Sequence, residues 1–373
     1  MLVRAVAAFI VVMIGTAHAL ADDVIDGRFG PGALYRLVRP ANWNGNLVLY
    51  AHGYISTANA VALPPEAEFV ISSAVSQGFA VALSSFSENG WAVKDGVQRT
   101  HQLLGIFTSK FGQPAHVYLS GASMGGLISI DLAETYPEAF AGALPICPVA
   151  GGAERQSDYL ANVRALFDLF YPGVLPGSAG NIPANINIEQ GIILPAAAAM
   201  SMNPAGAFTL AAISQTPVPF ATPSELIESI VTALSSHAGV FADLFDRTHG
   251  HPFFDNRRTL YTGALPQPVL DTINANVQRF DASPSALNYL DRYYEPSGDL
   301  RIPMLMLSTS RDPEAPRLHE ISYLNAVVST GSSQLLVQRE INRYGHCIFT
   351  PAEFAAAFSD LVRWVEAGIK PAP

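Results

Sequence analysis

The sequence has 373 residues, of which 49% are hydrophobic and 14% are charged, with a formal net charge of -10. This composition excludes an intrinsically disordered chain, and the length allows a large core plus a second, smaller unit. The negative charge argues against nucleic acid as a partner, because a protein that binds phosphates needs clustered Lys and Arg side chains.

The first 21 residues have the features of an export signal. Arg4 is followed by an apolar run up to Ile14 and then by small residues suited to cleavage. A membrane anchor is the alternative, but this run is shorter than the roughly 20 residues that cross a bilayer. The most apolar later stretch, 192–213, is interrupted by Pro204. We therefore expect residues 1–21 to be removed and the protein to be secreted or periplasmic, without stable membrane insertion.

Short apolar runs alternate with helical patterns along the chain, as expected for a parallel sheet buried on both faces. The runs predicted as strands are 46–50, 80–83, 116–120, 143–146, 302–307 and 334–338. Helical patterns cover 95–111 and 124–136, and a last helix begins at a capping box formed by Thr350 and Glu353 and ends at Gly368. These elements predict an α/β core.

From residue 151 to residue 300 the strand pattern stops. Ala-rich and amphipathic helical segments, broken by Pro and Gly, take its place. We predict that this region is a mostly helical lid, inserted into a core made of residues 22–150 and 301–373.

The segment Gly121-Ala122-Ser123-Met124-Gly125 fits the pattern Gly-x-Ser-x-Gly. A sharp strand-to-helix turn built from small residues exposes the serine hydroxyl, and the helix N-terminus beneath it favours developing negative charge. The alternative is a chance glycine-rich turn, because the bare pattern is common. Here a predicted strand ends just before the motif and an apolar helix starts just after it, so we predict that Ser123 is a nucleophile.

Three other segments also follow predicted strands at positions that matter for such a serine. His52-Gly53-Tyr54 follows strand 46–50, Asp312 follows strand 302–307 just before Pro313, and His346 follows strand 334–338. Together with the Ser123 motif, these segments resemble the α/β-hydrolase superfamily. The correspondence covers residues 32–146 and 300–367.

The resemblance implies an α/β-hydrolase fold: a mainly parallel, eight-stranded sheet flanked by helices, with the lid inserted after the sixth strand. In the chain order of that fold, His346 is the base for Ser123 and Asp312 is the carboxylate that orients the imidazole. Glu314 is the nearest substitute for Asp312. The histidines that fit the role of base less well are His101, His116 and His319.

The resemblance also implies an oxyanion hole made by the backbone N–H groups of Tyr54 and Met124. A tight turn without a catalytic part is the alternative for the Tyr54 loop. The expected reaction is hydrolysis of a carboxylic ester, small or polymeric, through an acyl-enzyme on Ser123 and without a cofactor. A serine peptidase of the same fold and a non-catalytic binding protein on this scaffold are the alternatives.

The two cysteines, Cys147 and Cys347, would meet oxidising conditions after export. In the fold implied by the resemblance, both lie at the catalytic edge of the sheet, and we predict a disulfide between them. The alternative is two buried free thiols. We expect no metal site: a cluster in the predicted lid reads as a solvated loop, and its members are Asp243, Asp246, His249, His251 and Asp255.

Overall fold

The computed structural model describes residues 22–183, 185–213 and 218–373, so the predicted export signal lies outside the described residues. Its centre is one sheet with the strand order β1-β2-β4-β3-β5-β6-β7-β8. Strand β2 pairs antiparallel with both β1 and β4, and all further pairs, from β4 to β8, are parallel. The strands are β1 (Asp23–Phe29), β2 (Ala33–Arg39), β3 (Leu47–Ala51), β4 (Ala80–Ser84), β5 (Val117–Ala122), β6 (Gly142–Ile146), β7 (Met304–Arg311) and β8 (Leu336–Tyr344).

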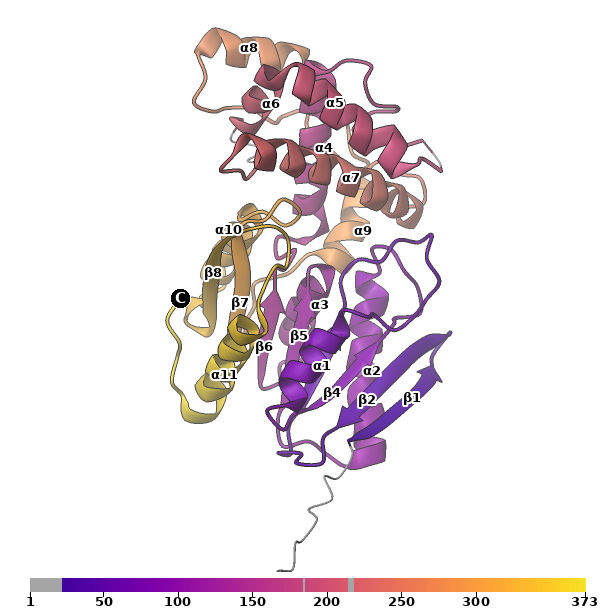
Figure 1. The fold of residues 1–373 in the computed structure, drawn as a ribbon, viewed down its shortest axis with the longest axis vertical. Helices are drawn as coiled ribbons and strands as arrows, with labels where there is room; N and C mark the ends of the chain where they lie inside the picture. The colour runs from indigo at the N-terminus through magenta and orange to yellow at the C-terminus, as the bar shows by residue number, and fades with distance from the viewer. Residues whose placement is uncertain (1–21, 184, 214–217) are drawn as a thin grey trace, which may run out of the picture.

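Helices cover both faces of this sheet (Figure 1). Successive residues of β3 alternate between two cores, because side chains of a strand point to opposite faces. Leu47 and Leu49 join one core, whereas Val48 and Tyr50 join the other. The first core contains side chains of α2 (Val93–Phe111), α3 (Met124–Thr135) and α10 (Leu318–Ser329), and the second contains those of α1 (Ala67–Val75) and α11 (Pro351–Ala367).

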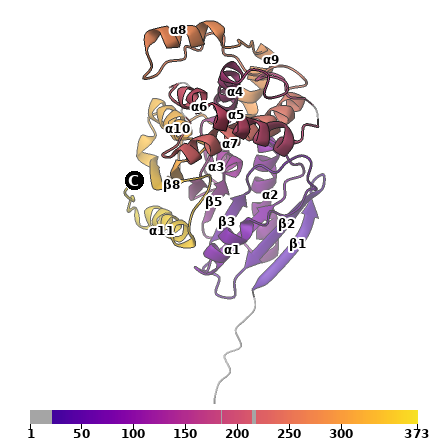
Figure 2. The ribbon, with the colours of Figure 1, turned by 45° about the horizontal axis from the view of Figure 1, so that its top comes forward.

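The region between β6 and β7 is helical, as predicted. Figures 1 and 2 show its helices grouped at one end of the sheet, the end at which the chain leaves β6. Its helices are α4 (Gly152–Phe170), the π-helix η1 (Glu189–Ile193), α5 (Leu194–Met202), α6 (Pro204–Ala211), α7 (Pro223–Arg247), α8 (Gln267–Asn276) and α9 (Pro284–Tyr294). The predicted fold class, a mostly parallel sheet flanked by helices with a helical insertion after the sixth strand, is confirmed.

No single helix in the described ranges is long and apolar enough to cross a membrane. The pair Glu189–Met202 and Pro204–Ala211, bent by 104° at its break, meets that criterion only as a pair and only by length and composition.

The strand predictions missed the antiparallel hairpin of β1 and β2. Strand β1 is an exposed edge that mixes charged and apolar residues, so it lacks the continuous apolar pattern of a central strand. The connecting Gly-Pro-Gly was nevertheless a turn signal in the sequence, and in the structure Gly30 and Gly32 both have positive φ. The predictions also ended β7 and β8 too early. Both run on past their buried parts, to Arg311 and Tyr344.

The start and end of α11 are as predicted. Thr350 accepts a hydrogen bond from the backbone N–H of Glu353, whose carboxylate accepts one in return from the N–H of Thr350. Gly368 ends the helix in the left-handed conformation.

Candidate active site

Ser123 lies at the turn between β5 and α3 with φ 57° and ψ -118°. A non-glycine residue rarely adopts this backbone conformation, and the surrounding packing must hold it there. The flanking glycines permit that packing: a methyl group on Gly121 would collide with the carbonyl oxygen of Gly125, and one on Gly125 with that of Ala51. The predicted strand-to-helix turn around Ser123 is therefore present.

Left-handed backbone is concentrated around this turn. Six non-glycine residues of the described ranges have positive φ, and four of them lie at or beside the candidate site: Phe86, Ser123, Cys147 and Cys347. Such strain persists only where the fold over-determines the conformation, and it clusters at functional sites.

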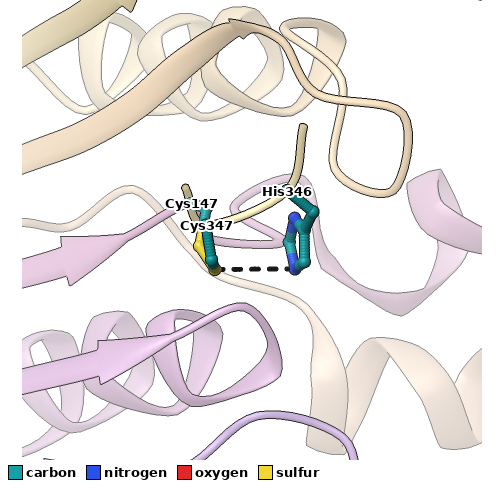
Figure 3. Close-up of side chains that lie close together, drawn as sticks. All are labelled: Cys147, His346 and Cys347. Carbon is teal, nitrogen blue, oxygen red and sulfur yellow. Dashed lines mark hydrogen bonds between the residues drawn. A yellow bond between two sulfur atoms is a disulfide. The ribbon is translucent and has the colours of Figure 1, made fainter. Parts of the chain in front are cut away.

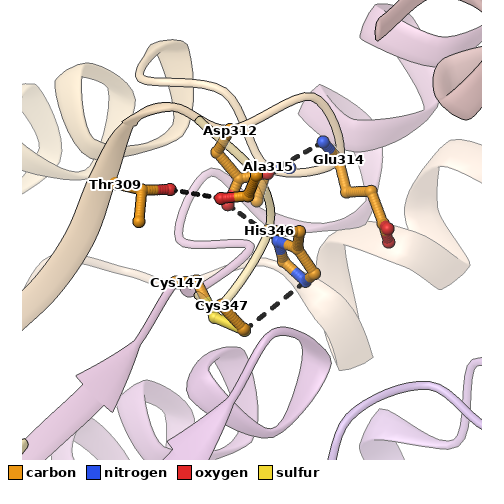
Figure 4. The surroundings of a disulfide bond; sticks show 8 residues. Cys147, Thr309, Asp312, Glu314, Ala315, His346 and Cys347 are labelled. Atoms are coloured by element: carbon orange, nitrogen blue, oxygen red, sulfur yellow. Dashed lines mark hydrogen bonds and ion pairs between the residues drawn. A yellow bond between two sulfur atoms is a disulfide. The ribbon is translucent and has the colours of Figure 1, made fainter. Parts of the chain in front are cut away.

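Asp312 and His346 form a close pair (Figure 4). His346 Nδ1 lies 2.7 Å from Asp312 Oδ2, and the Asp312 side chain is only 1% exposed. The other carboxylate oxygen, Oδ1, accepts hydrogen bonds from the N–H groups of Glu314 at 2.8 Å and Ala315 at 3.0 Å. Since a carboxylate can only accept, His346 Nδ1 must carry the proton, and in the neutral ring Nε2 keeps its lone pair.

The charge of this pair sets the pH at which His346 can act as a base. Burial of the ring disfavours its charged form, but the Asp312 carboxylate, helped by Glu314, outweighs burial and raises the pKa of His346 to about 9.

We therefore expect kcat/KM for an ester to rise from neutral pH toward an alkaline midpoint near 9, because only neutral imidazole accepts the serine proton. Initial rates measured across this range give the midpoint directly. A midpoint at or below the ordinary value of 6.5 would contradict the prediction.

The free energy of unfolding has the opposite pH dependence: the Asp312–His346 pair stabilises the fold fully below about pH 6.5, and this contribution is lost as pH rises through about 9.

The loop that carries His346 is fastened to β7. Thr309 Oγ1 donates a hydrogen bond of 2.6 Å to the carbonyl oxygen of Gly345, and Figure 4 shows Thr309 beside the His346 loop. The N–H of Gly345 donates to the carbonyl oxygen of Arg311 at 3.0 Å. Sequence reasoning missed Thr309, because nothing in its local pattern marks a hydroxyl whose partner is 36 residues away.

The structure joins Cys147 and Cys347 by a disulfide, with the two Cα atoms 5.4 Å apart, as predicted (Figure 3). The N–H of Ser123 donates to the carbonyl oxygen of Ile146, the residue before Cys147, at 2.9 Å. The bridge thus attaches the His346 loop to the strand end that also holds the backbone of Ser123. His346 Nε2 lies 3.6 Å from Cys347 Sγ, and within the described residues it forms no hydrogen bond with Ser123.

We expect replacement of both cysteines by alanine to lower the free energy of unfolding by about 2 to 5 kcal/mol, because the bridge closes a loop with a sequence separation of 200. Thermal unfolding measures the loss. Reductant added to the wild type should reproduce it, since the chain has no other cysteine. Two alkylated thiols in the unreduced, denatured wild type would show that the bridge does not form.

The predicted oxyanion donors also lie beside Ser123. A methyl group on Gly53 would lie 3.4 Å from Ser123 Cβ, so the loop that continues into Tyr54 packs directly against Ser123. Met124 is the first residue of α3, where an N–H has no partner within the helix. Neither N–H donates to a protein acceptor in the part of the chain that the structure describes.

His52, just before this loop, was not assigned a role from the sequence. It is buried, its Nδ1 lies 2.7 Å from the carbonyl oxygen of Gly53, and its ring stacks on Phe86 with centroids 3.9 Å apart. At the other end of the loop, the Tyr54 hydroxyl donates to the carbonyl oxygen of Gly239 in α7 at 3.2 Å. These contacts connect the loop to both the core and the insertion.

A cavity of about 710 Å³ lies between the Tyr54 loop and the insertion. Its wall is rich in aromatic side chains, among them Phe241, Phe253 and Phe280, and it carries two carboxylates, Asp246 and Asp281. Ser123 does not line the cavity, and Tyr54 is the residue that connects the cavity to the candidate site.

The cluster around His249 was predicted to be a solvated loop, which is only partly right: Asp243 and Asp246 lie in helix α7, and His249 and His251 are exposed beyond its end. Asp243 accepts a hydrogen bond from Arg247 at 2.8 Å, and Asp255 pairs with Arg257 at 2.5 Å. Among the described residues, the group of side chains close enough to share a metal ion is Cys147, His346 and Cys347, and both of its sulfurs are used in the disulfide.

No protein-family model matches this sequence, and no protein of curated function matches it. The fold, however, matches many solved structures. Feruloyl esterase B from Aspergillus oryzae aligns over 93% of this chain and 80% of its own, with a TM-score of 0.52 and 14% identity. An esterase from Pyrococcus furiosus aligns over 92% and 90% (TM-score 0.47, 10% identity), and a proline iminopeptidase from Mycobacterium smegmatis over 93% and 100% (TM-score 0.46, 14% identity).

The likeness to the feruloyl esterase structure, together with the strand order and the Ser123 turn, shows that this chain has the α/β-hydrolase fold. At these identities the likeness establishes the fold alone.

Proposed function

We propose that this protein is a secreted serine hydrolase that cleaves carboxylic esters, with Ser123 as nucleophile, His346 as base and Asp312 as orienting acid. The observation that carries the proposal is the hydrogen bond between buried Asp312 and His346, whose loop is bridged through the disulfide to the strand end that holds the strained Ser123. A non-catalytic binding protein would have no use for a buried carboxylate aligned on a histidine beside a strained serine.

In the proposed reaction, Ser123 Oγ attacks the ester carbonyl carbon while His346 Nε2 takes the hydroxyl proton. The N–H groups of Tyr54 and Met124 stabilise the oxyanion that forms, a contribution of about 3 kcal/mol per donor. The intermediate collapses to an acyl-enzyme, and the imidazolium returns the proton to the departing alcohol. Water then attacks with the same base, and the carboxylic acid and free Ser123 are released.

Export is supported by two independent features of the chain. The residues up to Ile14 have the charge and apolar pattern of a signal sequence. The disulfide between Cys147 and Cys347 needs an oxidising compartment, such as the periplasm or the medium. We accordingly propose that the enzyme meets small or polymeric esters outside the cytoplasm.

Ester rather than peptide cleavage is favoured by the cavity beside Tyr54. A peptidase that binds a free substrate amine needs acidic groups held ready for it. Both carboxylates of this cavity belong to exposed residues, and Asp281 is already paired with Arg257 at 2.8 Å. The aromatic wall instead suits an apolar acyl or alcohol group.

The test is a hydrolysis panel of p-nitrophenyl esters of increasing acyl length, aryl esters and peptide anilides, with Ser123→Ala as the background control. We expect ester hydrolysis well above that background and little anilide cleavage. A preference for anilides would replace the esterase by the peptidase, and rates equal to the Ser123→Ala background on every substrate would overturn the proposal of a serine hydrolase.

A further inference from the structure

The catalytic acid is held by two peptide groups of its own turn. The N–H of Glu314, which belongs to the Pro313–Glu314 peptide, and the N–H of Ala315, which belongs to the Glu314–Ala315 peptide, both donate to Asp312 Oδ1. Their positions decide how the carboxylate presents Oδ2 to His346. Whatever holds these two peptide planes therefore also holds the acid.

Two side chains of α4, the first helix of the insertion, bind the opposite ends of the same two peptides. The Tyr159 hydroxyl donates to the carbonyl oxygen of Pro313 at 3.0 Å. The side-chain amide of Gln156 donates to the carbonyl oxygen of Glu314 at 2.9 Å. Both side chains are buried, at 1% and 4% exposure, so water cannot take over either bond.

A third residue fixes the amide of Gln156. His319, fully buried on α10, accepts a hydrogen bond at Nδ1 from the N–H of Gly151 at 3.1 Å, so its proton must be on Nε2. Its Nε2 lies 2.7 Å from Gln156 Oε1 and donates to it, which turns the amide N–H₂ toward Glu314. Burial, together with the charges of Arg155 and His346, lowers the pKa of His319 to about 3, so the ring stays neutral and keeps this tautomer.

We propose that Tyr159 and Gln156 are positioning residues for catalysis, which act through the Pro313–Glu314 and Glu314–Ala315 peptides to aim Asp312 at His346, with His319 orienting Gln156. The inserted region thereby takes part in the chemistry of the core as well as covering it. This inference rests on the proposed function, because it assigns positioning residues to the proposed catalytic acid.

Each of the two peptide groups accepts a hydrogen bond at its carbonyl oxygen from an α4 side chain and donates one from its N–H to Asp312 Oδ1. A hydrogen bond to the carbonyl oxygen polarises the peptide and strengthens its N–H as a donor, in this case toward Asp312 Oδ1. Loss of the Tyr159 hydroxyl leaves a buried carbonyl without its partner and lets that peptide tilt. Asp312 then turns away from the direction that best stabilises charged His346.

The test compares Tyr159→Phe and Gln156→Met with a matched control, Tyr261→Phe. Tyr261 is equally buried, and its hydroxyl donates to Asn162, also on α4, but it does not contact the acid turn. We expect Tyr159→Phe to lower kcat roughly tenfold with KM unchanged, and Tyr261→Phe to leave both within about twofold. Added to Asp312→Asn, Tyr159→Phe should cost less than about twofold more, because the group that it positions is gone.

A second readout does not need catalysis. In the Ser123→Ala background, the titration midpoint of His346, followed by NMR of its imidazole nitrogens, should fall when Tyr159→Phe or Gln156→Met is added and should stay unchanged with Tyr261→Phe. A loss of stability alone would lower the melting temperature without moving this midpoint.

An unmoved midpoint in both α4 variants, or an equal loss of kcat with and without Asp312, would overturn the positioning role. If the wild type hydrolyses no ester and the midpoint still falls, the proposed function fails while the positioning of Asp312 stands. If Tyr159→Phe does not fold, Gln156→Met decides the question at the second peptide.

Discussion

Replacing Ser123 by alanine should lower kcat for ester hydrolysis by on the order of 10⁶, down to the residual rate left by binding and oxyanion stabilisation. The side chain at the strained turn is the proposed nucleophile, and no acyl-enzyme can form without its oxygen. Folding should be unaffected, because alanine keeps every atom of serine except the hydroxyl. Ser123 Oγ forms no hydrogen bond with His346 in the described part of the chain, so none is lost there. Steady-state rates measure the loss of kcat, and labelling by a fluorophosphonate, followed by intact mass, measures the loss of the reactive oxygen.

A serine of strand β5, three residues before the turn, offers the matched control. Ser120 is buried in β5, and its hydroxyl donates to the carbonyl oxygen of Leu144 at 3.0 Å, away from the turn. Ser120→Ala removes the same kind of atom from a neighbouring serine and should keep most of the activity and all of the labelling. Retention of more than about a hundredth of wild-type activity in Ser123→Ala would exclude Ser123 as the nucleophile.

Replacing Asp312 by asparagine should lower kcat by about 10⁴. The two backbone N–H groups that meet Oδ1 require an acceptor there, so the amide oxygen of the new side chain takes that place. Its N–H₂ then takes the place of Oδ2 and donates to His346 Nδ1, which moves the ring proton to Nε2. A protonated Nε2 cannot accept the proton of Ser123, while the turn itself keeps its geometry.

Glu314→Gln is the control for this change. The Glu314 carboxylate raises the pKa of His346 through space, but it forms no hydrogen bond with His346 within the described residues. We expect Glu314→Gln to keep kcat within a few-fold and to shift the alkaline midpoint slightly toward lower pH, because one negative charge is lost. If Glu314→Gln were the damaging change and Asp312→Asn the mild one, Glu314 would be the acid.

The parts of the molecule that sequence reasoning predicted correctly are those specified by neighbouring residues. The turn at Ser123 could be predicted because small residues must flank it and because a strand and a helix adjoin it in the sequence. The central strands could be predicted because burial on both faces requires a continuous apolar run, as in β3. The start of α11 could be predicted because its capping box lies within four residues.

Sequence reasoning brought Asp312, His346 and the two cysteines together only through the chain order of a known fold. The single sequence contains no signal for the hydrogen bonds that hold the acid, which join Tyr159 to Pro313 across 154 residues and Gln156 to Glu314 across 158.

What the sequence by itself determined is therefore the local chemistry: a serine at a strained turn, a sheet with two buried faces and a helical insertion. Only the tertiary structure decided which side chains of that insertion reach the acid turn, and that the aromatic cavity adjoins Tyr54. Local elements are set by contacts a few residues apart, which repeat with the period of a helix or strand. A hydrogen bond between distant segments depends on how whole elements pack, and it leaves no periodic trace in the sequence.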